Sequence, residues 1–392
     1  MNATPQSFDD LLKPAPAAPA PDQAAAPCCG PAGHPVQPVA GLPSATQPFV
    51  AGVQETPLGP VPRVTSRLTW ADRWGAIKAR WGVGRMDYRV QPGVYALHEP
   101  RPDSPVLVTA NYKLTFDKLR KELRGIRAWL FCLDTDGVNV WCAAGKGNLG
   151  TDNLTASVEG AELAKLVSHR ELLLPQLAAP GISAHQVRRA CGFAASFGPI
   201  RARDIPAFLA NGREALPEMR RVSFTTLERV VLIPVELVTA LKHVLYIAPL
   251  LALLGMGLGW WRGLGLVPAL AADGLYAGLG AVWGLLGGAV LSPLLLPWLP
   301  GRAFALKGLW PGLVLALAWW ALAPAGLPLW ERSAWLLVTP GFSSFLAMNF
   351  TGASTYTSLS GVKKEMRWAV PLQILIGLAG LVLWLAGGLG YL

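Results

Sequence analysis

The chain has 392 residues, of which 52% are hydrophobic and only 15% are charged, and its formal net charge is +10. This length suffices for two or three domains, and the shortage of charge after residue 230 predicts a soluble part joined to a membrane part. Nucleic-acid binding is not expected, because the basic residues are not gathered on one face with aromatic residues between them. Attraction to anionic lipids or anionic substrates explains the positive charge better.

Residues 1–65 are rich in Ala, Pro and Gln and contain few side chains that could form a core. This composition predicts a disordered or polyproline-like arm. The arm carries a vicinal pair, Cys28 and Cys29. With five scattered cysteines and no recognisable secretory signal, we expect reduced thiols at the cytoplasmic face rather than disulfides. Since no CxxC pair is present, an iron–sulfur cluster held by this chain alone is not expected.

Residues 66–218 alternate between strand-like and helix-like segments, which predicts a Rossmann-like α/β domain with a mostly parallel sheet. The predicted strands are 106–109, 128–133, 172–174 and 193–197. The predicted helices are 115–124, capped by Thr115, then 139–146, 154–167 and 184–190. Ligands bind such sheets beyond the carboxyl ends of the strands. Segment 134–147 leaves a strand end and is therefore expected to contact a ligand.

Residues 219–392 predict a transmembrane domain of about five helices, because five long stretches are almost free of charge. These stretches are 230–262, 273–302, 307–331, 332–363 and the residues after 367. The fourth is the weakest, since it turns polar after residue 350. The apolar piece Gly263–Ala272 is too short to cross and is expected to be re-entrant or interfacial. Lys and Arg residues accumulate on one side of these stretches. The positive-inside rule then predicts a multi-pass protein of the inner membrane with its soluble domain in the cytoplasm.

The predicted helix 139–146 carries the residues of greatest chemical interest. Helical spacing places Asn139, Cys142 and Lys146 on one face, where an amide, a thiol and an ammonium group would meet a planar partner. The nearby cation favours the thiolate, which is a soft ligand for transition metals. These residues alone leave two interpretations equally open, a half-buried structural cysteine and a metal ligand.

The neighbours of Cys142 have expected roles of their own. Ala143 and Ala144 would remove bulk, so that a flat ligand could lie against the backbone. Trp141 would point elsewhere and pack the helix onto the domain. Gly145 and Gly147 would let the chain leave the helix.

Segment 139–147, Asn-Val-Trp-Cys-Ala-Ala-Gly-Lys-Gly, resembles the cap-helix motif of the HgcA family of mercury-methylating corrinoid proteins. It also resembles the cobalamin-binding domain of the large subunit of the corrinoid iron–sulfur protein. The similarity continues through 168–171, 174–181, 184–185 and 198–202, and covers about residues 66–218. A membrane region without a cluster motif fits the HgcA family better. No histidine here stands in the Asp-x-His-x-x-Gly motif, so histidine ligation of cobalt is not expected.

The resemblance implies a corrinoid-dependent methyltransferase. In it, Cys142 is the lower axial ligand of cobalt, and a methyl group passes from a cobalamin-type corrinoid to mercuric ion, giving methylmercury. It implies as partners a folate-type methyl donor and a ferredoxin-like iron–sulfur reductant, which is HgcB in the family. The expected corrinoid contacts are Asn139, Val140, Trp141, Cys142, Ala143, Ala144, Gly145, Lys146, Thr151, Gln176 and His185.

Three further interpretations stay open. Cys28 and Cys29 could capture mercuric ion on a flexible arm, or they could be a chance pair. The chain could carry methyl groups to another acceptor in one-carbon metabolism. It could also be a non-enzymatic membrane transporter or sensor with a cytoplasmic ligand domain.

Overall fold

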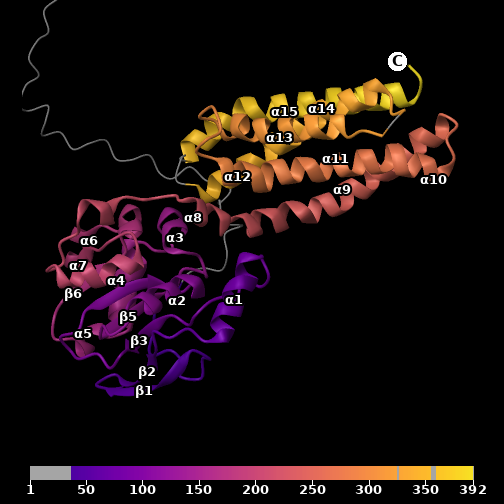
Figure 1. The fold of residues 1–392 in the computed structure, drawn as a ribbon. Helices are drawn as coiled ribbons and strands as arrows, with labels where there is room; N and C mark the ends of the chain where they lie inside the picture. Colours follow the sequence, from indigo (N-terminus) through magenta and orange to yellow (C-terminus); the bar gives the residue numbers. More distant parts are fainter. Residues whose placement is uncertain (1–36, 325, 355–358, 392) are drawn as a thin grey trace, which may run out of the picture.

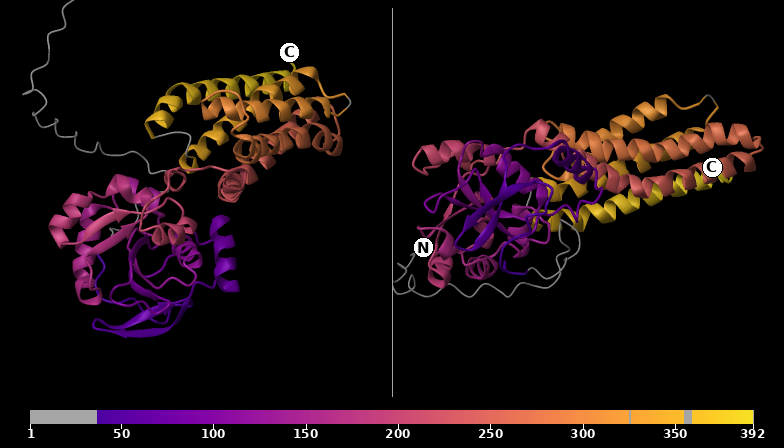
Figure 2. Two further views of the ribbon diagram at one scale, coloured as in Figure 1. Left: turned by 60° about the vertical axis from the view of Figure 1, so that its left-hand side comes forward. Right: turned by 90° about the horizontal axis from the view of Figure 1, so that it is seen from below.

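The computed structural model describes residues 37–324, 326–354 and 359–391. In these residues an α/β domain and a bundle of long helices lie side by side, joined at α8, Thr226–Val230 (Figure 1). The two further views keep the same separation (Figure 2). The predicted division into a soluble-type and an apolar helical part therefore has a counterpart in the structure.

One mixed sheet of seven strands forms the centre of the α/β domain, in the order β1-β2-β3-β5-β4-β6-β7. Strands β5, β4, β6 and β7 run parallel, while β3 is antiparallel to β5 and β1 is antiparallel to β2. All residues of β3, β4 and β5 are buried. The strands are β1 Val50–Thr56, β2 Gly59–Val64, β3 Gly93–Leu97, β4 Val106–Ala110, β5 Ala128–Leu133, β6 Glu171–Leu174 and β7 Ala194–Phe197.

The four predicted strands correspond to β4–β7, and the predicted helices are present with two corrections. Helix α2 begins at Lys113, so Thr115 is not its cap, and the preceding Tyr112 makes no side-chain cap. The helix predicted over 154–167 is two helices, because Glu162 adopts a φ of 47° between them. The domain helices are α1 Trp70–Arg80, α2 Lys113–Glu122, α3 Val140–Lys146, α4 Thr151–Gly160, α5 Leu163–Leu166, α6 Ala184–Cys191 and α7 Ile205–Ala210, with short 3₁₀ turns η2 Gln176–Gly181, η3 Ala202–Asp204 and η4 Pro217–Arg220.

The N-terminal arm is shorter than the predicted 1–65. Residues 50–64 form the hairpin β1–β2, which pairs with β3 at the edge of the sheet. The hairpin was missed because its apolar residues are interrupted by prolines, yet Val61 and Val64 are almost fully buried. The α/β domain thus includes residues that we had assigned to the arm. Cys28 and Cys29 lie outside the described residues.

The bundle consists of long helices whose axes are roughly aligned (Figure 1). Four helical segments among the described residues are long and apolar enough to cross a membrane, namely Thr226–Trp261, Leu266–Leu295, Phe304–Ala321 and Gly361–Gly388. The elements are α9 Ile233–Trp261, α10 Leu266–Ala269, the π-helical turn η5 Leu270–Gly274, α11 Leu275–Leu285, the π-helical turn η6 Leu286–Leu291, α12 Ser292–Leu295, α13 Phe304–Ala321, α14 Leu329–Asn349, the 3₁₀ turn η7 Phe350–Ala353 and α15 Leu359–Gly388.

Helix α14 corresponds to the weak fourth span and is not among those four segments. Its 21 residues pack against α13, α15 and α11. Its polar side chains bind neighbouring helices, since Ser343 donates to the Gly308 carbonyl at 2.7 Å and Ser344 to that of Ala305 at 2.9 Å. A helix enclosed by other helices needs less apolar surface than one facing lipid, which explains its composition.

The segment Gly263–Ala272 is not a separate piece. It forms a turn and then the first part of one continuous helical segment, Leu266–Leu295, that contains Asp273. The prediction of a re-entrant or interfacial segment was wrong, because Asp273 was read as the end of an apolar stretch. Its carboxylate is instead buried and paired with Arg262.

Candidate functional site

The helix α3 lies over the carboxyl end of the parallel strands, as the sequence predicted. It follows β5, and its neighbours are the end of β4 and the 3₁₀ turn η2, which follows β6. The chain order of the strands reverses between β4 and β6, and such switch points are where α/β sheets bind ligands. Figure 1 shows α3 on the side of the domain that faces the bundle, close to α8.

The loop Asp134–Gly137 that leads into α3 is held by Asn111, at the end of β4. The Asn111 side-chain oxygen accepts from the Thr135 hydroxyl at 2.8 Å and from the backbone N–H of Thr135 and Gly137, each at 3.0 Å. Its amide nitrogen donates to Asp134. The sequence analysis missed Asn111, because a lone Asn after a strand carries no recognisable motif. By these bonds the end of β4 fixes the start of α3.

Helix α3 is defined by a cap at each end. The Asn139 side chain accepts a hydrogen bond from the backbone N–H of Cys142 at 3.0 Å and is the N-cap. Gly147 ends the helix in the left-handed conformation, with a φ of 84°, as expected for a glycine that lets the chain leave a helix. The side-chain oxygen of Asn139 thus serves the helix, and the predicted contact of this residue with a ligand stays a prediction.

The outer face of α3 differs from the predicted one. Ala143 and Ala144 are buried and face the core, so they do not form the open surface. Trp141 is 42% exposed, so the prediction that it packs the helix onto the domain was wrong. Cys142 and Lys146, each partly buried, share this side of the helix with Gly145, where an added Cβ would meet no atom within 4 Å, and Cys142 also packs against the hydrophobic core.

This outer face fits a planar group. Gly145 leaves one turn of backbone uncovered beside the Cys142 thiol, and Trp141 offers an exposed aromatic ring on the same side. The buried alanines let η2 approach instead, since a Cβ added to Gly181 would lie 3.2 Å from the Ala144 Cα atom. A cysteine sulfur beside open backbone is, once deprotonated, a suitable soft donor for a transition metal such as cobalt.

The remaining predicted contacts are divided between α3's surroundings and the solvent. The Thr151 hydroxyl accepts from the backbone N–H of Ser183 at 2.9 Å, which ties α4 to the start of α6. Gln176 begins η2 beside α3, and its side chain accepts from Arg220 at 2.7 Å. His185 is exposed on α6. The side chains of Thr151 and Gln176 therefore bind Ser183 and Arg220, in elements near α3.

The other described cysteines lie away from this face. Cys132 is fully buried in β5, as predicted for a core residue, and burial raises the pKa of its thiol well above the usual value. Cys191 is half-buried at the end of α6, and burial raises its pKa as well. No group of three His, Cys, Asp or Glu side chains among the described residues is arranged to hold a metal ion.

The cavity found in the α/β domain does not lie at α3. A cavity of about 390 Å³ lies at the opposite edge of the domain, between β2 and the residues after α2, and Arg63, His98 and Arg127 line it. It is open and polar, and none of the predicted residues reaches it.

Comparison with known proteins finds a family match over part of the α/β domain. Residues 83–209 match the family model CdhD, described as the CO dehydrogenase/acetyl-CoA synthase delta subunit. The CdhD and corrinoid iron–sulfur protein family binds a cobalamin-type corrinoid. The matched segment begins after α1 and includes β3–β7. It therefore contains α3 and the turn η2 that packs against it.

Curated relatives carry related names. The acetyl-CoA decarbonylase/synthase complex subunit gamma of Archaeoglobus fulgidus is 34% identical over 97 residues, which are 24% of this chain and 21% of the relative. Subunit gamma 2 of Methanosarcina thermophila is 38% identical over 99 residues, with the same two shares. The gamma subunit of Methanopyrus kandleri is 31% identical over 127 residues, 32% of this chain and 27% of that protein. The chain thus spans about a fifth to a quarter of the length of these relatives.

Proposed function

We propose that this chain is a membrane-anchored corrinoid methyltransferase of the HgcA family, with mercuric ion as its methyl acceptor. The observation that carries the proposal is the outer face of α3, where a half-exposed Cys142 stands beside uncovered backbone within the segment matched by a corrinoid-binding family. The apolar helices support the membrane anchor.

Three residues of α3, and Asn139 just before it, have roles in this proposal. A bound corrinoid supplies a cobalt centre that carries a methyl group. Cys142 would hold the cobalt through its thiolate, and Lys146 would place a cation near that thiolate. Asn139 fixes the first turn of the helix, so the Cys142 side chain has one position. Trp141 covers an edge of the bound group and shields it from water.

Several parts of the proposal concern partners. The described residues hold no cluster of metal ligands, so electrons must come from a ferredoxin-like iron–sulfur protein of the HgcB type. The methyl group comes from a folate-type donor. Cys28 and Cys29 capture mercuric ion ahead of transfer, and Cys28→Ala/Cys29→Ala should lower methylmercury formation at limiting mercury while corrinoid binding persists.

The orientation of the chain belongs to the proposal too. The end of the bundle near α8 carries most of the basic residues, and Arg229, Lys307 and Arg367 are among them. At the other end, Arg262 pairs with Asp273, and Arg332 donates to backbone carbonyls. The unbalanced positive charge on the domain side of the bundle supports a cytoplasmic α/β domain under the positive-inside rule. Five helices then cross the inner membrane, with α14 enclosed by the others.

The decisive experiment uses the purified full chain with bound corrinoid. Cys142→Ala should change the ultraviolet–visible spectrum of the corrinoid and abolish methylmercury formation with the ferredoxin-like partner. Cys191→Ala is the matched control, because it removes another half-buried thiol away from α3, and it should alter neither. An identical spectrum in Cys142→Ala defeats the ligand assignment, and purified protein that takes up no corrinoid defeats the carrier role.

A second candidate is a membrane-bound methyl carrier for another acceptor in one-carbon metabolism. It is favoured by the names of the curated relatives, which belong to acetyl-CoA decarbonylase/synthase complexes. Bound corrinoid without methylmercury formation would select this candidate. A transporter or sensor would bind no corrinoid at all.

A further inference from the structure

Helix α1 has its side chains arranged in the reverse of the usual order for a helix of a water-soluble domain. Its buried residues are Asp72, Gly75 and Ala79, whereas its large apolar residues point outward. These outward residues recur at intervals of four, three and four positions and so form one stripe along the helix. We call this stripe the Trp face: Trp70, Trp74, Ile77 and Trp81, which are 74%, 51%, 42% and 46% exposed.

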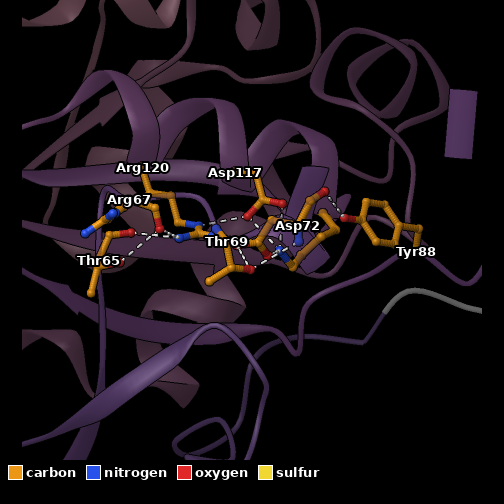
Figure 3. Close-up of polar contacts among 8 residues, drawn as sticks. Thr65, Arg67, Thr69, Asp72, Tyr88, Asp117 and Arg120 are labelled. Carbon is orange, nitrogen blue, oxygen red and sulfur yellow. Dashed lines mark hydrogen bonds and ion pairs between the residues drawn. The ribbon is translucent and has the colours of Figure 1, made fainter. Parts of the chain in front are cut away.

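The inner side of α1 is fixed by a buried ionic network with α2 (Figure 3). Lys113 contacts Asp72 at 2.8 Å and Asp117 at 2.6 Å, and Arg120 contacts the same two carboxylates at 2.8 Å each. The Tyr88 hydroxyl donates to the Asp72 carbonyl at 3.2 Å. The helix cannot rotate to bury its tryptophans without breaking this network, so the Trp face is held outward.

Close packing on the inner side has the same effect. A Cβ added to Gly75 would lie 2.5 Å from the Tyr88 hydroxyl oxygen, so α1 lies directly on the segment that follows it. A capping box between Thr69 and Asp72 fixes the start of the helix. The exposure of the Trp face is therefore a consequence of ordered packing rather than of a loose helix.

The basic residues of α1 flank the Trp face. Lys78 is exposed on one side of the stripe, and Arg73 and Arg80 lie on the other. A helix with tryptophans on one face and Lys or Arg along its borders is typical of helices that lie in the interface of a membrane. Trp rings prefer the level of the lipid headgroups, and basic residues there are attracted to anionic lipid.

The position of α1 fits the same partner. A Cβ at Gly82, just after α1, would lie 3.8 Å from Val238 of α9, and Arg85 acts electrostatically on Glu236 of the same helix. Figure 1 shows α1 at the boundary between the domain and the bundle, running across the direction of the bundle helices. If the bundle crosses a bilayer, α1 lies in the plane of its surface. The family match begins at residue 83, so α1 and the bundle both fall outside it.

We propose that α1 is an interfacial helix whose Trp face docks on the anionic lipid surface around the bundle. The proposal rests on the membrane placement of the bundle proposed above. Docking holds the α/β domain against the bilayer at a second point besides the linker to α8. The segment that follows α1 also reaches the candidate site, because its Arg89 pairs at 2.9 Å with Asp136 in the loop before α3.

The test uses the full chain in nanodiscs of phosphatidylcholine and phosphatidylglycerol that contain a lipid with a photoreactive diazirine near the glycerol. After illumination, mass spectrometry measures the lipid attached to each peptide. Peptides of α1 should be labelled together with those of the bundle, whereas the hairpin β1–β2 at the far edge should not. A labelled bundle with α1 at the level of the hairpin overturns the inference alone, and an unlabelled bundle overturns the membrane placement itself.

Two variants separate lipid docking from other occupants of the Trp face. Trp70→Ser/Trp74→Ser/Trp81→Ser should lose more than half of the α1 labelling and leave the bundle labelling unchanged. Arg73→Glu/Lys78→Glu should lose it as well, as should nanodiscs without phosphatidylglycerol. Arg124→Glu/Arg127→Glu makes the same charge change beside the far cavity and should have no effect. An α1 that is protected from hydrogen exchange without lipid labelling indicates a protein occupant and contradicts the proposal.

Discussion

The α/β domain and the helical bundle differ in the apolar and polar side chains that they expose and bury. In the domain, the strands β3, β4 and β5 bury apolar residues throughout. In the bundle, apolar residues such as Leu250 and Leu375 are exposed, while Thr339 and Ser343 of α14 are fully buried. The exposed apolar side chains of the bundle are consistent with a membrane protein, and α1 exposes a similar apolar stripe although it belongs to the α/β domain.

The largest effect should come from the ionic network between α1 and α2. Asp72→Asn leaves Lys113 and Arg120 buried with a weaker partner, and breaking a buried ion pair costs about 3–5 kcal/mol. In a calorimetric melt of the detergent-solubilised chain, the transition of the α/β domain should move to lower temperature while that of the bundle stays in place. Asp87→Asn, an exposed carboxylate on the segment after α1, is the control. Equal shifts of both transitions would mean that the two regions unfold as one unit.

Acid should have a related but smaller effect. Burial alone would raise the pKa of Asp72, but hydrogen bonds from Lys113 and Thr69 and the charge of Arg120 hold it well below its usual value. The folded domain therefore keeps this carboxylate charged where the unfolded chain is protonated. Its contribution to stability is complete above about pH 5 and is lost as the pH falls below about 4. The domain transition should drop in this range, and Asp72→Asn should flatten the drop.

The third effect belongs to the bundle. A Cβ at Gly308 of α13 would lie 2.4 Å from the Ala347 Cβ and 2.9 Å from the Ser343 carbonyl oxygen of α14. Gly308→Ala should overpack this contact and cost about 1–3 kcal/mol, lowering only the bundle transition. Gly257→Ala in α9 is the matched control, because a Cβ there meets nothing within 4 Å. A silent Gly308→Ala would show that α13 and α14 do not pack closely.

Much of the fold was predictable because many of its segments are continuous apolar stretches of characteristic length. The buried strands β4 and β5 are continuous apolar runs, and the membrane-type helices are long stretches without charge. The hairpin β1–β2 and helix α1 were not predicted, for physical reasons that differ. In the hairpin, prolines interrupt the apolar pattern that would indicate a strand. Helix α1 buries an aspartate and a glycine and exposes tryptophans, so its pattern does not indicate a helix of a folded domain. A pattern that assumes an apolar interior cannot detect such a helix.

The candidate site shows the same limit at smaller scale. Helical spacing correctly placed Cys142 and Lys146 on one face and Gly147 at the end of the helix. It could not say which face of α3 the domain covers, and so it assigned Trp141 inward and Ala143 outward. That choice depends on η2, which approaches α3 from 30 residues further along the chain, a tertiary contact with no local signal.

The smallest effect should appear at α3 itself. Asn139→Ala removes the acceptor of the Cys142 backbone N–H, and loss of such an N-cap costs about 0.5–2 kcal/mol. The cost is local, so hydrogen exchange should quicken in the first turn of α3 while both melting transitions change little. Asn139→Asp keeps a capping oxygen and should restore slow exchange. If Asn139 instead served mainly as a ligand contact, exchange would be unchanged in both variants and only corrinoid affinity would fall. The two outcomes decide whether this residue acts on the helix or on what the helix binds.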